Sequence, residues 1–130
     1  MNVHSQIHNA PCAPQVMATL YFGTTAGGRD PIQMDEFYSF LETSVTPQFP
    51  GFTLSHVTGY WKGEAENCRV LTILAEDDDS FRQSIRIIAE HYKSRFNQEA
   101  VAYSFTAAQF TLNCWPFGPV GTYHRPGKGY

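Results

Sequence analysis

The stretch from Cys68 to Phe96 reads CRVLTILAEDDDSFRQSIRIIAEHYKSRF and decides the fold of this protein. Its first part, Cys68 to Ala75, is a nearly continuous apolar run, which is typical of a strand in the middle of a sheet. Beyond the acidic residues that follow, apolar side chains recur at helical spacing and predict one buried helix face. That face consists of Phe81, Ile85, Ile88, Ala89 and Tyr92. A central strand that leads directly into an amphipathic helix indicates a mixed α and β fold.

The start of this helix carries capping signals. Ser80 and Gln83 have the spacing of a capping box, and the aspartates in front of Ser80 suit the positive end of the helix dipole. We therefore expect Ser80 to cap the N-terminus and the helix to end near Phe96.

Three elements precede the central strand. Gln15–Gly23 is rich in β-branched and aromatic residues and predicts a strand, and apolar residues at helical spacing from Met34 onward predict a helix to about Thr46. Phe52–Trp61 alternates and predicts a second strand, with a possible bulge at Gly59. We interpret Lys62–Asn67 as the turn that joins this strand to the central one in a hairpin.

The last element follows the long helix. Residues Glu99–Phe105 and then Gln109–Leu112 alternate and predict a strand or a strand pair. The order is then β-α-β-β-α-β, which predicts a ferredoxin-like α+β sandwich, an antiparallel sheet with two helices on one face.

The chain divides into three parts in this interpretation. We expect residues 1–14 to be a disordered leader, residues 15–113 to form the ferredoxin-like domain, and residues 114–130 to be a tail rich in proline, glycine and aromatic residues. Aromatic residues make up 15% of the sequence, and the predicted helices leave one sheet face uncovered. We therefore expect another subunit to cover that face and the tail to pack on a neighbouring subunit.

Composition excludes several functional classes. A chain of 130 residues with 42% hydrophobic residues is long enough for one domain with a core of its own. The net charge is −3 and the nine basic residues are scattered, which argues against nucleic-acid binding. No apolar run is long enough to predict a membrane span.

The metal-binding residue types show no useful spacing. Cys12, Cys68 and Cys114 are odd in number and form no CxxC motif, so neither a disulfide framework nor a zinc site is indicated and a reducing cytoplasm fits best. The five histidines show no metal-ligand spacing outside the expected leader. We predict no metal and no other cofactor.

The hairpin carries the more informative candidates. Tyr60 and Trp61 precede Glu64 and Glu66, and aromatic faces beside carboxylates suit a cationic or sulfonium ligand. In the alternative interpretation Trp61 only packs and the two glutamates form a solvated hairpin tip. Spacing alone favours this alternative.

Two further candidates are weaker. Gln98 and Glu99 lie at a junction between helix and strand, where side chains often reach ligands from a rigid frame, although an ordinary polar turn has the same pattern. Arg69 is a possible clamp for a carboxylate, or else a plain surface cation.

Four short motifs resemble a family of small uncharacterised bacterial proteins. They are LYFG at residues 20–23, VTPxFP at 45–50, GYW at 59–61 and YKxRFxQE at 92–99. This resemblance covers most of the chain but implies no chemistry.

A more distant resemblance does imply chemistry. The PGF motif at 50–52, the GY strand end at 59–60 and the QEAV segment at 98–101 resemble the phage enzymes that destroy S-adenosylmethionine. The resemblance implies a PII-like homotrimer with active sites between subunits. It also implies a lyase that yields 5′-methylthioadenosine and homoserine lactone, located in the cytoplasm of an infected bacterium and counteracting host methylation and restriction.

The same resemblance implies roles for individual residues. Glu66 takes the acidic catalytic position, with Glu64 as a close competitor, and Tyr60 is the aromatic hydroxyl beside the substrate. The remaining substrate-binding residues are Trp61, Arg69, Gln98 and Glu99. The alternative is a non-catalytic PII-like module that binds an adenosine-type effector, and a structural assembly protein is a third possibility.

Overall fold

The computed structural model describes residues 14–25 and 31–111. The predicted leader and tail lie outside the described residues, apart from Pro14. The predicted β-α-β-β-α-β order is confirmed. The elements are β1 (Gln15–Gly23), α2 (Met34–Phe40), the π-helical continuation η1 (Leu41–Val45), β2 (Thr53–Trp61), β3 (Glu64–Glu76), α3 (Asp79–Arg95) and β4 (Ala102–Ala108).

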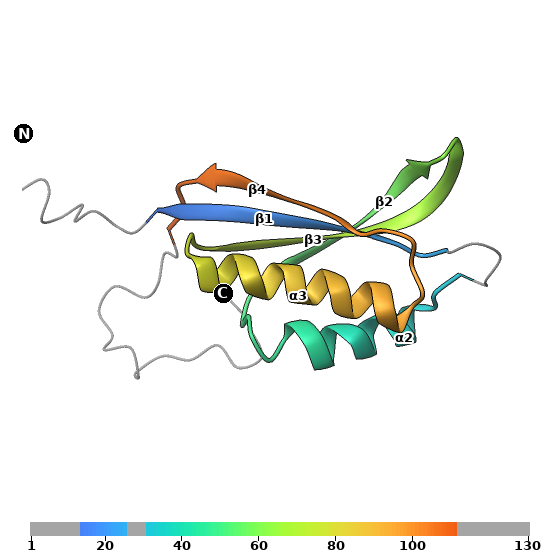
Figure 1. Ribbon diagram of the computed structural model, residues 1–130, viewed down its shortest axis with the longest axis horizontal. Coiled ribbons are helices and arrows are strands. Elements are labelled where there is room, and N and C mark those ends of the chain that lie inside the picture. Colours follow the sequence, from blue (N-terminus) through green and yellow to red (C-terminus); the bar gives the residue numbers. More distant parts are fainter. Residues whose placement is uncertain (1–13, 26–30, 112–130) are drawn as a thin grey trace, which may run out of the picture.

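The four strands form one antiparallel sheet in the order β2-β3-β1-β4. Both helices lie on the same face of this sheet, and the other face is bare in the part of the chain that the structure describes (Figure 1). This arrangement is the ferredoxin-like α+β sandwich that the sequence predicts.

The core lies between the sheet and the helices. Alternate residues of β1 point into it, and all five residues of the predicted α3 face are buried, as expected. Aromatic rings fill its centre, with centroids 4.3 Å apart for Phe22 and Tyr92 and 5.0 Å apart for Phe40 and Tyr92. The core therefore holds many of the aromatic side chains, while Tyr21, Trp61 and a few others remain exposed.

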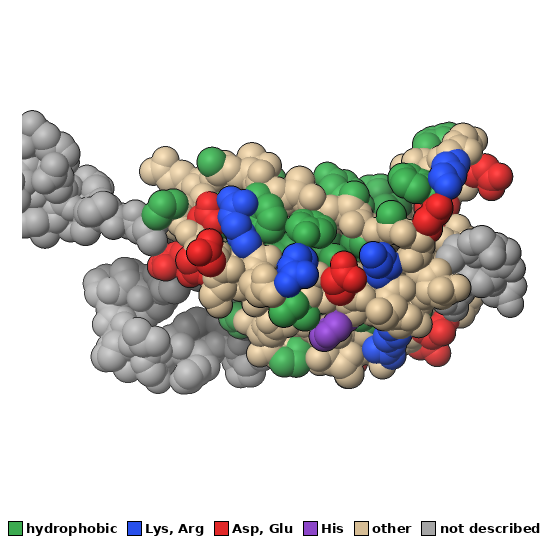
Figure 2. Space-filling model, in the orientation of Figure 1, with side chains coloured by type: hydrophobic (Ala, Val, Ile, Leu, Met, Phe, Trp, Pro, Cys, Tyr) green, Lys and Arg blue, Asp and Glu red, His purple; other side chains and the backbone are tan. Residues whose placement is uncertain are grey.

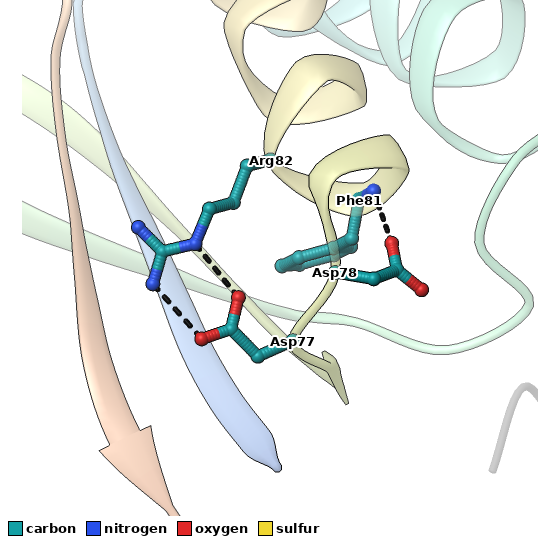
Figure 3. A network of polar contacts seen from close by, with 4 residues as sticks. All are labelled: Asp77, Asp78, Phe81 and Arg82. Atoms are coloured by element: carbon teal, nitrogen blue, oxygen red, sulfur yellow. Dashed lines mark hydrogen bonds and ion pairs between the residues drawn. The ribbon is translucent and has the colours of Figure 1, made fainter. Parts of the chain in front are cut away.

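The N-terminus of α3 is capped by Asp78 and not by Ser80 (Figure 3). The Asp78 carboxylate accepts a 2.7 Å hydrogen bond from the backbone N–H of Phe81, while Asp77 accepts two bonds from Arg82. The prediction was wrong because Asp78 is still in an extended conformation, whereas Ser80 already lies in the first helical turn.

The hairpin turn is shorter than predicted. Only Lys62 and Gly63 form it, both with positive φ, at 51° and 83°. The residues from Glu64 to Asn67, expected in the turn, belong to β3. The pairing of β2 with β3 is continuous through Gly59, so the expected bulge is absent there.

The connection from α3 to β4 is also irregular where a strand was expected. Asn97 has a φ of 51°, and the backbone N–H of Gln98 donates to the carbonyl of Lys93 at 3.0 Å, which closes the helix. β4 begins only at Ala102, and the residues from 109 to 111 add no second strand.

Candidate functional site

The sheet face opposite the helices, called the open face below, carries exposed apolar side chains. Tyr21, Val57, Trp61 and Leu74 are all between two-fifths and half exposed. Strand alternation and the pairing register place them on this one face, since Tyr21 pairs with Val70 and Trp61 pairs with Glu64. An uncovered sheet face with apolar side chains is a surface suited to a ligand or to another chain.

A pocket of about 870 Å³ lies at the hairpin end of the open face. The hairpin tip, the end of β1 and the connection from α3 to β4 surround it, and we call it the hairpin pocket. Six of the seven residues selected from the sequence line it, namely Tyr60, Trp61, Glu64, Glu66, Gln98 and Glu99. Its volume lies within the range of roughly 300–1,000 Å³ typical of small-molecule sites.

Glu66 is the most firmly held carboxylate of the pocket. Its Oε2 accepts hydrogen bonds from the Thr25 hydroxyl at 2.7 Å, the Thr25 N–H at 3.1 Å and the Thr24 N–H at 3.3 Å. Its Oε1 accepts none from the described residues. A Cβ at Gly23 would lie 2.9 Å from Oε1, so the absence of a side chain there leaves space beside that oxygen.

Glu99 joins two walls of the pocket. Its Oε2 accepts from the indole N–H of Trp61 at 3.0 Å, and its Oε1 accepts from the ammonium group of Lys62 at 2.8 Å. The hydrogen bond from Lys62, and then that from Trp61, holds the pKa of Glu99 below its ordinary value. This carboxylate is therefore charged at neutral pH and fixes the Trp61 ring at the pocket rim. We call the three residues the Glu99 bridge.

Cys68 lies on the pocket floor between two glycines. Cys68 on β3 pairs with Gly23 on the neighbouring strand β1. On its other side, a Cβ added at Gly59 would lie 3.3 Å from the Cys68 Cβ. Burial, and then the charge of Glu66, raises the pKa of the Cys68 thiol. The thiol is thus protonated at neutral pH and behaves as a small apolar side chain.

Arg69 is not brought into the hairpin pocket. Its side chain is buried on the helix-covered face, where Nη2 donates to the carbonyl of Ile32 at 3.0 Å and the guanidinium lies 4.8 Å from the Phe37 ring centroid. Arg69 lies three positions after Glu66 on the same strand, so their side chains point to opposite faces.

Sequence reasoning missed Tyr21, Lys62 and the Thr24–Thr25 pair. Tyr21 reaches the pocket because β1 lies between β3 and β4, and Thr25 reaches Glu66 from far away in the chain. No local pattern signals either contact. For Lys62 a signal existed, since the Lys-Gly pair is a possible two-residue hairpin turn.

The pocket combines negative charge with aromatic surface. Glu64 and Glu66 lie on the strand next to Trp61, and Lys62 is the basic residue of the lining and is already paired with Glu99. Such a pocket attracts a ligand that carries a positive charge next to an apolar or aromatic part.

Neither a metal centre nor a membrane span is found among the described residues. They contain no cluster of three or more histidine, cysteine or acidic side chains arranged to hold a metal ion. Within the same ranges, no helix has the length and apolar character needed to cross a membrane.

Comparison with known proteins gives a family and a fold. A family model described as "Protein of unknown function (DUF3574)" matches residues 17–111. No curated protein matches the sequence at a significant level.

Two solved structures have a similar fold. The first, described as phage SAM lyase in complex with S-methyl-5′-thioadenosine, has a TM-score of 0.56 at 12% identity and covers 74% of this chain and 83% of its own. The second, a phage SAM lyase in the apo state, has a TM-score of 0.54 at 12% identity and covers 75% of this chain and 83% of its own.

Proposed function

The chain belongs to the DUF3574 family of proteins of unknown function, and we propose that it is an S-adenosylmethionine lyase that works in the hairpin pocket. The observation that carries the proposal is that Trp61, Glu64 and Glu66 meet in one pocket. The similarity of the fold to phage SAM lyase structures supports it. The proposed products are 5′-methylthioadenosine and homoserine lactone.

The proposed reaction needs little from the protein in chemical terms. A carboxylate oxygen of the substrate forms a bond to the γ-carbon of the same molecule. The bond from that carbon to sulfur breaks, and its electron pair stays on sulfur. The carboxylate and sulfonium charges disappear together, so no protein nucleophile and no activated water take part. The protein has to fold the substrate into a reactive conformation and to remove water from the two charges.

The walls of the pocket suit this task. Tyr21 and Trp61 provide aromatic surface that would exclude water from the sulfonium group, and the Glu99 bridge prevents the Trp61 ring from turning away. Gln98 and Glu99 lie on the side where we place the nucleoside or amino-acid part of the substrate. In this proposal Glu99 acts mainly by positioning Trp61.

Glu66 would bind the α-ammonium group or a ribose hydroxyl through Oε1, which accepts no hydrogen bond within the described ranges. A carboxylate close to the sulfonium would stabilise the reactant more than the transition state, because the sulfonium charge is lost in the reaction. Glu66 is therefore assigned to a group whose charge or polarity does not change. Glu64 lies on the same strand and is the alternative carboxylate for this contact.

We also propose that the active unit is a homotrimer with sites between subunits. The hairpin pocket opens onto the open face of the sheet, and Trp61 at its rim is 50% exposed. A neighbouring subunit on this face would close the pocket over Trp61. Tyr60 pairs with Ala65 and so points to the other side of the hairpin.

A second candidate is a non-catalytic module that binds an adenosine-type effector. The observation that favours it is that the Glu66 Oε2 accepts three hydrogen bonds from Thr24 and Thr25. A carboxylate fixed in this way could hold the residues after β1 in place and bind a ligand without taking part in a reaction. This candidate predicts binding without turnover.

The test is incubation of the purified protein with S-adenosylmethionine, followed by mass spectrometry of the products. We expect methylthioadenosine and homoserine lactone, with no ¹⁸O from labelled water in the lactone. Label incorporated during cleavage would indicate a hydrolase instead. Thermal stabilisation by methylthioadenosine without product formation would favour the binding module. If the protein shows neither product formation nor thermal stabilisation, both candidates are contradicted.

Two variants then test the role of Glu66. Glu66→Gln should abolish turnover while the oligomer stays intact. Thr25→Val removes one bond to Oε2 and leaves Oε1 untouched, so it should retain most activity if Oε1 is the oxygen that meets the substrate. Full activity in Glu66→Gln would assign the role to Glu64 or Glu99.

A further inference from the structure

The end of the open face that lies far from the hairpin pocket is apolar, and an acidic run that leads into α3 follows it in the chain. Met17 pairs directly with Leu74, which is 42% exposed, and the acidic run Glu76–Asp79 follows at once. Figure 2 shows acidic side chains gathered at this end of the molecule. Within the described ranges neither Glu76 nor Asp79 forms an ion pair, whereas Asp77 is paired with Arg82 (Figure 3).

The chain leaves the described structure at this same end. Ala108, the last residue of β4, pairs with Gln15, and the backbone N–H of Phe110 donates to the side-chain Oε1 of Gln15 at 3.0 Å. Gln15 and Met17 point to the same face of the sheet, because residues two apart on a strand share a face. The side chain of Gln15 thus holds Phe110 on the open-face side.

The residues after Thr111 have a composition that complements this surface. They include Arg125 and Lys128 but no aspartate or glutamate. Their large apolar side chains are Leu112, Trp115, Phe117, Val120, Tyr123 and Tyr130. Such a segment can offset the entropy cost of ordering only by burying its rings against something else.

We propose that residues 112–130 cover the end of their own sheet's open face that lies far from the hairpin pocket, which leaves the hairpin end for the neighbouring subunit. The rings of Trp115 and Phe117 would pack on Met17 and Leu74. The Gly118–Pro119 pair suits a turn, which would bring Arg125 and Lys128 back to the free acidic residues.

Geometry favours the same chain over a neighbour. Phe110 is bonded to Gln15, and Gln15 pairs with Glu76, so the segment starts next to this surface and meets it at an effective concentration of about millimolar. Six extended residues span roughly 20 Å, which is enough to bring Trp115 and Phe117 over Leu74. The proposal does not depend on the lyase activity. It differs from the sequence-based expectation that the tail packs on a neighbouring subunit, and the second experiment below separates the two.

The first experiment uses the fluorescence of Trp115. The chain has two tryptophans, so Trp61→Phe leaves Trp115 as the only reporter. We expect a blue-shifted emission that acrylamide quenches weakly. Leu74→Asp in that background should shift the emission to longer wavelength and raise the quenching constant severalfold. Ile87→Asp is the matched control, because Ile87 is exposed to a similar extent but lies on α3. Solvent-like emission before the second substitution, or equal effects of Leu74→Asp and Ile87→Asp, would overturn the proposal.

The second experiment asks which chain supplies the segment. In a background with the three native cysteines replaced by serine, Leu74→Cys is combined with Phe117→Cys and oxidised. A monomer with an internal disulfide on a non-reducing gel supports the proposal, provided that Ile87→Cys with Phe117→Cys gives none. Disulfide-linked dimers would overturn it in favour of a neighbour's tail, and the absence of any disulfide would overturn docking on this face altogether.

Discussion

At the scale of single residues, the two oxygens of Glu66 have different surroundings. Three donors from Thr24 and Thr25 hold Oε2, and the missing side chain at Gly23 leaves space beside Oε1. A carboxylate held by one oxygen keeps a fixed direction for the other, which is the kind of preorganisation that ligand sites use.

Gly23→Ala tests this division. A Cβ at residue 23 would lie 2.9 Å from the Glu66 Oε1, so the carboxylate has to move. Because the atom in the way is the end of a flexible side chain, we expect a large loss of turnover or ligand binding with only a small fall in thermal stability.

Gly63→Ala is the matched control for this prediction. Gly63 has a φ of +83° and no atom within 4 Å of an added Cβ. The left-handed backbone costs an alanine roughly 1 kcal/mol, so thermal denaturation should show a lower Tm while ligand binding is retained. Equal ligand binding in the Gly23→Ala variant and the wild type would contradict the assignment of Oε1.

The Glu99 bridge predicts a pH dependence. Hydrogen bonds from Lys62 and Trp61 hold the pKa of Glu99 below its ordinary value of 4.5. The stabilisation is therefore complete above that value and is lost as the pH falls through the lower folded-state pKa. The difference in the free energy of unfolding between wild type and Glu99→Gln, measured in urea, should shrink as the pH falls below 4.5. A difference that stays constant over this range would show that the bridge does not form in solution.

At the scale of elements, the start of α3 depends on one carboxylate. Asp78 caps the helix through the N–H of Phe81, and Ser80 already lies inside the first turn. We expect Asp78→Ala to lower the free energy of unfolding by about 1 kcal/mol. Ser80→Ala should change it little, and both values follow from urea denaturation. A larger loss for Ser80→Ala would restore the capping role that the sequence suggested.

The hairpin illustrates how far local patterns reach. The sequence predicted β2 closely, but it assigned Glu64 and Glu66 to the turn because KGEAEN is polar throughout. In the structure these residues continue β3, since two residues with positive φ are enough to reverse the chain. If the predicted central strand had been extended back to Glu66, the alternation of side chains would have placed Arg69 and Glu66 on opposite faces from the sequence alone.

At the scale of the whole molecule, the open face governs assembly in our proposal. Val57 is 44% exposed there and lies near the hairpin pocket without lining it. Val57→Asp should dissociate the proposed trimer to monomers and remove turnover with it, because a charge would replace apolar contact at the seam. Ile87→Asp on the helix side should leave both unchanged. Native mass spectrometry and the product assay measure the two effects, and a trimer that persists in Val57→Asp would place the interface elsewhere.

The sequence by itself determined the order of the elements and the face that α3 buries. Both follow from local geometry, because side chains repeat every 3.6 residues on a helix and every two on a strand. This is why the α3 face, with Phe81 and Tyr92, was predicted residue by residue.

The tertiary structure alone decided which residues meet at the pocket. Thr25 and Glu66, or Trp61 and Glu99, are each about forty positions apart in the chain. Thr25 follows β1 and Glu99 lies in the connection from α3 to β4, so both contacts depend on how separate elements pack together, which no single segment encodes. The sequence therefore selected most of the candidate residues, whereas the fold separated Arg69 from them, added Tyr21, and fixed which oxygen of Glu66 accepts hydrogen bonds from Thr24 and Thr25.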